Sequence, residues 1–233
     1  MTNHQTPLLI CLFIAGFAAT QIPLLTAPSK SLALWGEKPG RETVSLTKPT
    51  TKEPKTSSTA AAAVAGSIHG TITTVPARAA SSAVVYLEKG PASHKVNGVI
   101  DNKQLAFVPH VLVITAGGKV DFVNNDPFPH NVFSPDHEKF DIGSLPPKGK
   151  KSKIFNHVGA YTLLCNIHPN MKAYLVVSPT SYFSKTNQDG SFTISNVPEG
   201  TYKVTAWAPG VKSATQTVRV TGDATANFEL RRK

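Results

Sequence analysis

Three side chains that bind soft metal ions fall within seven residues of this chain. They are Cys165, His168 and Met171, in the segment Cys165-Asn-Ile-His168-Pro-Asn-Met171. The apolar run 161–165 predicts a strand, and the polar stretch that follows it predicts a loop. A thiolate, an imidazole and a thioether together suit copper, which cycles between Cu(I) and Cu(II). Any fold that uses this segment must therefore close a short loop between two strands around one ion.

A second imidazole has to come from elsewhere in the chain. The best candidate is His130, in Asp126-Pro-Phe-Pro-His130-Asn-Val, just after the apolar strand predicted at 120–123. Two histidines and a cysteine in a trigonal arrangement, with a weak axial methionine, form the blue-copper site. The sequence thus predicts one copper ion held by His130, Cys165, His168 and Met171. The alternative is a buried structural cysteine beside a core methionine and a surface histidine, because cysteine often packs as a small hydrophobe.

The N-terminal region indicates export. Residues 8–19 form an apolar run, which suits the core of a signal peptide better than a full membrane span, although no Lys or Arg precedes it. We therefore predict a signal peptide or N-terminal anchor over 1–33 and a disordered Lys/Pro/Thr/Ala linker over 34–66. The second cysteine, Cys11, lies in the apolar run, so the folded part holds a single cysteine that cannot form an internal disulfide.

Short strand-like segments and turn residues fill the rest of the chain. Turn pairs such as Gly117-Gly118 and Asp189-Gly190 separate them, and no long amphipathic helix is evident. This pattern predicts an all-β fold with the strand spacing of a β-sandwich. The predicted strands are 67–75, 83–88, 96–100, 106–113, 119–124, 151–155, 161–165, 172–177, 191–194, 201–208 and 215–220.

The two histidine-containing segments resemble the amicyanin and plastocyanin group of cupredoxins. That family shares the Cys-x-x-His-Pro-x-Met spacing of 165–171 and the Pro-His-Asn-Val run of 129–132. The resemblance implies a Greek-key cupredoxin sandwich over about 95–180. It also implies that Asn131 and Pro169 lie next to the ligands, with hydrogen bonds of Asn131 joining the two metal-binding loops. Phe128 and Pro129 are expected to form an apolar rim for docking.

A second resemblance joins the two ends of the folded part. Residues 70–73 and 83–87, together with 189–194 and 197–204, are similar to a carboxypeptidase regulatory-like (transthyretin-like) sandwich. The same combination occurs in proteins called methylamine-utilisation-protein-like. Our hypothesis is a discontinuous sandwich, 67–94 and 181–233, with the cupredoxin domain 95–180 inserted into one of its loops. The alternative is two consecutive domains, with 67–94 adding strands to the cupredoxin.

Electron transfer is the function that these features favour. Multicopper oxidases flank the copper cysteine with histidines, whereas Leu164 and Asn166 stand there in this chain, so an enzyme is not predicted. The alternative is a periplasmic copper carrier without a role in electron transfer, and a metal-free structural sandwich is a third reading. The formal net charge of +10 indicates either solubility with a basic linker, or docking to an acidic redox partner or an anionic surface. The sequence has no basic run with interleaved aromatic residues, so nucleic-acid binding is not predicted. We expect a monomer. If the N-terminus is retained, we expect it to tether the protein to the inner membrane.

Overall fold

The computed structural model describes residues 65–75, 77–91 and 93–232. The predicted signal peptide or anchor, 1–33, lies outside the described residues, as does nearly all of the predicted linker, 34–66. Within the described part of the chain, no helix is long and apolar enough to cross a membrane.

The described residues are mostly in strands, with almost no helix, which confirms the predicted all-β class. The one helical element in this part is a short 3₁₀ turn, η1 (Ala77–Ser82). The strands are β1 (Ala65–Val75), β2 (Val84–Leu87), β3 (Gly98–Lys103), β4 (Ala106–Val108), β5 (Val111–Thr115), β6 (Gly118–Asn124), β7 (His130–Ser134), β8 (Phe140–Leu145), β9 (Lys150–Phe155), β10 (Gly159–Leu164), β11 (Lys172–Ser178), β12 (Phe183–Lys185), β13 (Ser191–Pro198), β14 (Gly200–Trp207), β15 (Ala214–Val220), β16 (Ala224–Thr225) and β17 (Phe228–Arg231).

Strands β3 to β11 form two sheets, which we call the first sandwich. One sheet has the order β5-β11-β10-β7-β8 and the other β4-β3-β6-β9. Alternate side chains of these strands point inward, as a half-buried strand requires, and they pack into one apolar core. The largest fully buried members of this core are Phe122, Phe155, Tyr161, Leu163 and Leu175.

The remaining strands form the second sandwich. Its sheets have the orders β13-β1-β16, with β17 also paired to β1, and β12-β2-β14-β15. Between them lies a separate buried cluster of mostly aliphatic side chains, which includes Ile68, Ile72, Leu87, Phe192 and Phe228.

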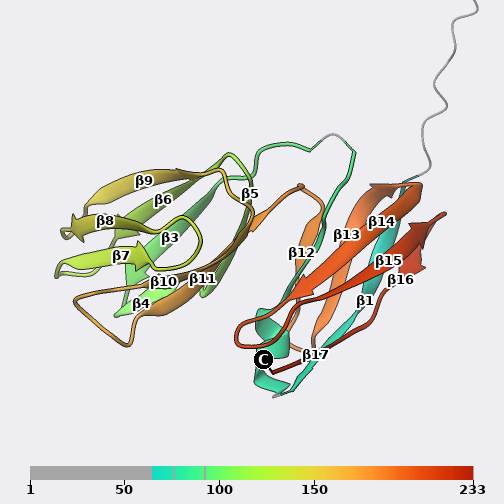
Figure 1. Ribbon diagram of the computed structural model, residues 1–233. Coiled ribbons are helices and arrows are strands. Elements are labelled where there is room, and N and C mark those ends of the chain that lie inside the picture. The colour runs from blue at the N-terminus through green and yellow to red at the C-terminus, as the bar shows by residue number, and fades with distance from the viewer. Residues whose placement is uncertain (1–64, 76, 92, 233) are drawn as a thin grey trace, which may run out of the picture. The chain divides into compact units, whose positions relative to one another are not determined.

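The second sandwich is built from both ends of the described chain. Strand β1 pairs with β13 and β17, so that Ile72 lies opposite Phe228, and β2 pairs with β14 and β12. Figure 1 shows β1, early in the sequence, lying beside β13 and among the last strands of the chain. These are the pairings that the insertion hypothesis requires, although the domain division itself stays a prediction.

Strand β1 begins two residues earlier than the sequence predicted, because Ala65 and Gly66 pair with Pro198 and Val197. A side chain at position 66 would not fit, since a Cβ there would lie 1.8 Å from the carbonyl oxygen of Gly222. The backbones approach this closely only because Gly66 has no side chain.

Replacing Gly66 with alanine should therefore destabilise the protein. We expect a loss of about 1–3 kcal/mol in the free energy of unfolding, the range for overpacking a closed site. Urea unfolding would measure it. Val75→Ala is the control, since Val75 lies in the same strand but is half exposed, and should change stability by no more than about 0.5 kcal/mol. Equal stabilities of the two variants would show that the close approach does not matter.

The prediction of a single strand over 106–113 is wrong. The structure has two strands there, β4 and β5, on different sheets. Pro109 lies between them and has no backbone N–H to donate to a ladder, so the strand cannot run through it.

Candidate metal centre

The site lies at one end of strand β10, between its two neighbours in the sheet. Cys165 follows the last residue of β10, His168 lies in the loop to β11, and Met171 directly precedes β11. His130 is the first residue of β7, on the other side of β10. Because β7 and β10 run antiparallel with Phe133 opposite Leu164, His130 is set opposite the loop that follows Cys165.

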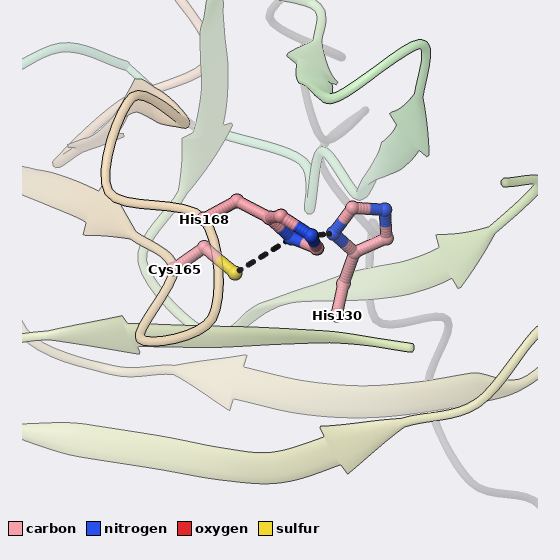
Figure 2. Close-up of side chains that lie close together, drawn as sticks. All are labelled: His130, Cys165 and His168. Atoms are coloured by element: carbon pink, nitrogen blue, oxygen red, sulfur yellow. Dashed lines mark hydrogen bonds between the residues drawn. The ribbon is translucent and has the colours of Figure 1, made fainter. Parts of the chain in front are cut away.

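The structure brings His130, Cys165 and His168 together. Their donor atoms all lie within 4.8 Å of one another. The Nδ1 atoms of the two histidines are 3.1 Å apart, and the Cys165 Sγ lies 3.9 Å from the His168 Nδ1. Figure 2 shows the three side chains pointing toward one another, with His168 between the other two. In the described part of the chain this is the only group of three or more such residues close enough to hold a metal ion.

The donors are largely shielded from solvent. His130 is fully buried, Cys165 is 4% exposed and Met171 is 1% exposed, whereas His168 is only partly buried. Met171 belongs to the same buried cluster as Cys165, and its N–H donates to the carbonyl of His168 at 3.0 Å, which closes the loop. One imidazole edge thus reaches the surface while the thiol stays inside.

The buried carboxylate of Asp126 contacts the far side of His130. Its Oδ2 lies 2.8 Å from the His130 Nε2, and it also accepts backbone N–H groups of Gln104 at 2.6 Å and Leu105 at 3.0 Å. Burial raises the pKa of Asp126, but the N–H donors of Leu105 and Gln104 and the imidazole of His130 outweigh burial and lower it. From the sequence, Asp126 belongs to the segment that carries His130, but no role was predicted for it. Its spacing of four residues from His130 was the one feature that could have indicated their contact.

Asn131 connects the two segments that carry the donors. Its Nδ2 donates to the Asp141 Oδ1 at 2.6 Å and to the Gly143 carbonyl at 3.2 Å. Its Oδ1 accepts the backbone N–H of Asn166, next to Cys165, at 3.4 Å. These hydrogen bonds are of the kind that the resemblance implies, and the role of Asn131 stays a prediction. Asp141 was not singled out from the sequence.

The surface around His168 carries apolar side chains. The ring of Phe128 lies 5.3 Å from that of His130 and 5.5 Å from that of His168. Pro129 and Pro169 are exposed, and Ile167, which the sequence analysis did not single out, is 46% exposed. The other described histidines lie outside the group: His69, His94, His110, His137 and His157, all exposed.

Comparison with known proteins agrees with this donor set. A family model described as copper binding proteins of the plastocyanin/azurin family matches residues 94–178. Chloroplastic plastocyanin from Physcomitrium patens is 37% identical over 79 residues, which are 34% of this chain and 42% of that protein. Residues 94–178 are cupredoxin-like. Two imidazoles and a thiolate, converging in a largely buried site, fit copper, so copper is the cofactor that the family model and the cupredoxin-like site support.

Several solved structures are similar to a part of this chain. A purple cupredoxin from Nitrosopumilus maritimus is 26% identical, with a TM-score of 0.33, and covers 35% of this chain and 99% of its own. A copper-containing nitrite reductase from Thermus scotoductus SA-01 is 28% identical, with a TM-score of 0.34, over 37% of this chain and 23% of its own. Amicyanin from Paracoccus versutus is 21% identical, with a TM-score of 0.33, and covers 40% of this chain and 97% of its own.

A second family model, polysaccharide lyase family 4 domain II, matches residues 167–228. This match overlaps the end of the cupredoxin-like region and most of the second sandwich. The resemblance of the second sandwich to a carboxypeptidase regulatory-like module stays a prediction.

Proposed function

We propose that this chain is an exported, mononuclear blue (type 1) copper protein that acts in electron transfer. His130, Cys165 and His168 would hold the ion and Met171 would be its weak axial ligand. The observation that carries the proposal is the convergence of two imidazoles and the single described cysteine in a site where only His168 is partly exposed.

The donor set favours electron transfer over catalysis. When bound, copper supplies a one-electron couple between Cu(I) and Cu(II). Four protein donors leave no open position for a substrate, in contrast to catalytic metal sites. Leu164 and Asn166 flank the cysteine and offer no imidazole toward a second metal cluster. The hydrogen bonds that Asn131 makes across the two loops hold the donors in place, so little rearrangement needs to accompany a change of charge.

The partly exposed edge of His168 is the proposed port for electrons. Phe128 packs against its ring, and Pro129, Ile167 and Pro169 surround it with apolar surface that a redox partner could cover briefly. The net charge of +10 favours an acidic partner.

The remaining parts of the chain would place this site outside the cytoplasm and support it there. We propose that residues 1–33 direct export and that 34–66 act as a tether, in keeping with the apolar run and the Lys/Pro/Thr/Ala composition of these segments. We also propose that the copper domain, 95–180, is inserted into a second sandwich made of 67–94 and 181–233. The pairing of β1 and β2 with strands after residue 180 supports this division.

A redox titration of the copper-loaded full chain tests the function. The proposal expects a reversible one-electron couple, fast electron self-exchange, and slow loss of Cu(I) to a competing chelator. A chain that gives up Cu(I) rapidly and shows no reversible couple would instead be a copper carrier.

Met171→Leu tests the axial ligand. Leucine has nearly the same volume, so we expect stability to change by less than about 1.5 kcal/mol. Because the thioether would be lost while His130, Cys165 and His168 remain, the reduction potential should rise and the blue colour should persist. Voltammetry and the visible spectrum measure these two effects. Leu175→Met, a similar exchange in the same core, should leave the potential unchanged; equal potentials in all three proteins would exclude Met171 as a ligand.

A further inference from the structure

We propose that Asp126 is the positioning residue of the metal site, because it fixes His130 in one tautomer and ties that imidazole to the turn between β3 and β4. The proposal rests on the assignment of His130 as a ligand under the proposed function. The observations that support it are the hydrogen bonds of the Asp126 carboxylate to His130, Gln104 and Leu105.

The Asp126 carboxylate is held in place by backbone groups of the β3–β4 turn. The N–H of Gln104 donates to its Oδ1 at 2.6 Å and the N–H of Leu105 to its Oδ2 at 3.0 Å. The Asp126 side chain is only 7% exposed, and its own N–H donates to the Asn124 Oδ1 at 3.0 Å. A buried carboxylate with partners on both oxygens has little freedom to rotate, so its remaining acceptor capacity has a fixed direction.

The turn that supplies these donors is the two-residue loop of the β3–β4 hairpin. Its residues, Gln104 and Leu105, both have positive φ values, 55° and 57°, as a favoured type of two-residue hairpin turn requires. Both N–H groups donate to the Asp126 carboxylate, so a turn that the hairpin itself fixes holds this carboxylate in place.

The fixed carboxylate determines where the proton on His130 lies. Carboxylate oxygens accept and do not donate, so His130 must carry its hydrogen on Nε2, 2.8 Å from the Asp126 Oδ2. A neutral imidazole has one N–H, so the Nδ1 of His130 keeps its lone pair, directed toward His168. The Nδ1 of His130 lies 3.1 Å from the Nδ1 of His168, so this lone pair faces the space between the two imidazoles where the ion would be held.

Asp126 thus presets His130 as a metal ligand through its Nδ1. A carboxylate partner also makes the imidazole of His130 a stronger donor, and loss of such a partner typically weakens metal binding about 10–100-fold.

Nitrogen NMR of the ¹⁵N-labelled full chain tests the assignment. In the metal-free protein we expect a protonated Nε2 and an unprotonated Nδ1 on His130. Addition of Zn(II), which is diamagnetic and binds cysteine and histidine, should leave this pattern unchanged. A metal-free chain with the hydrogen of His130 on Nδ1 would overturn the proposal.

Asp126→Asn tests the same point by substitution. We expect a mixture of His130 tautomers and Zn(II) binding weakened about 10–100-fold. The matched control is Asp121→Asn in strand β6, which removes an equal charge from the ion pairs of Asp121 with Lys119 and Lys150 and should change neither readout. Unchanged tautomer and affinity in Asp126→Asn would also overturn the proposal. If Asp126→Asn fails to fold, the ¹⁵N NMR spectrum of the unsubstituted chain alone tests the proposal.

The outcome is separable from that of the proposed function. The His130 tautomer is measured before any metal is added. The expected tautomer in a chain that gives no blue copper band would contradict the proposed function and leave the placement of the His130 proton by Asp126 intact.

Discussion

Replacing Cys165 with serine should abolish the intense thiolate-to-copper absorption of the Cu(II)-loaded protein. The sulfur of Cys165 is the single thiol among the described residues and lies 3.9 Å from the Nδ1 of His168. Serine keeps the shape and removes the soft donor that Cu(I) prefers. We expect the band to disappear and copper affinity to fall by more than the roughly 10–100-fold that loss of an outer hydrogen-bond partner costs. The visible spectrum and a competitive copper titration measure the two effects.

The chain supplies its own control for this experiment. Cys11 is its one other cysteine and lies in the N-terminal apolar run, far from the site in sequence. Cys11→Ser should leave band and affinity unchanged. Persistence of the band in Cys165→Ser, or its loss in Cys11→Ser, would contradict the assignment of the thiolate.

Replacing Phe122 with alanine should cost about 3–5 kcal/mol of stability. Phe122 is fully buried in the core of the first sandwich, and its ring lies 6.2 Å from that of Phe140. Truncation removes apolar contacts and leaves a cavity that surrounding strands can fill only in part. Because a domain is typically stable by about 5–15 kcal/mol, this loss should be evident in urea unfolding of the metal-free chain.

Ile154→Ala is the matched control for the core substitution. Ile154 lies in the neighbouring strand β9, and its side chain is 55% exposed, so its truncation should change stability by no more than about 0.5 kcal/mol. A Phe122→Ala protein within about 1 kcal/mol of the unsubstituted chain would contradict the assignment of Phe122 to a closely packed core.

The local part of the site was predictable from the sequence because its chemistry is carried by a short segment. Cys165, His168 and Met171 lie within one loop, and a loop that short between paired strands can only bring its side chains together. His130 could be found because its histidine–asparagine pair follows an apolar strand. Asp126 could not be assigned a role, since its contact with His130 depends on two backbone N–H groups from the separate β3–β4 turn.

The strands that the sequence did not predict lack a clear alternating pattern. In β7, four of five residues are buried, so both faces are covered and the two-residue period is absent. Strand β8 contains Gly143 with a φ of 68°, close to a register shift in its pairing with β7. Strands β12, β16 and β17 have two to four residues, too few for a pattern to be distinguished from a loop. Their partners lie far away in the chain, so only tertiary pairing defines them.

X-ray absorption at the copper edge, on the full chain loaded with one equivalent of Cu(II), tests the central assignment most directly. Two imidazole nitrogens and one sulfur at short distance from a single copper ion are expected, with the sulfur contribution absent from Cys165→Ser. A first shell of nitrogen and oxygen alone would mean that copper sits somewhere other than between positions 130, 165 and 168.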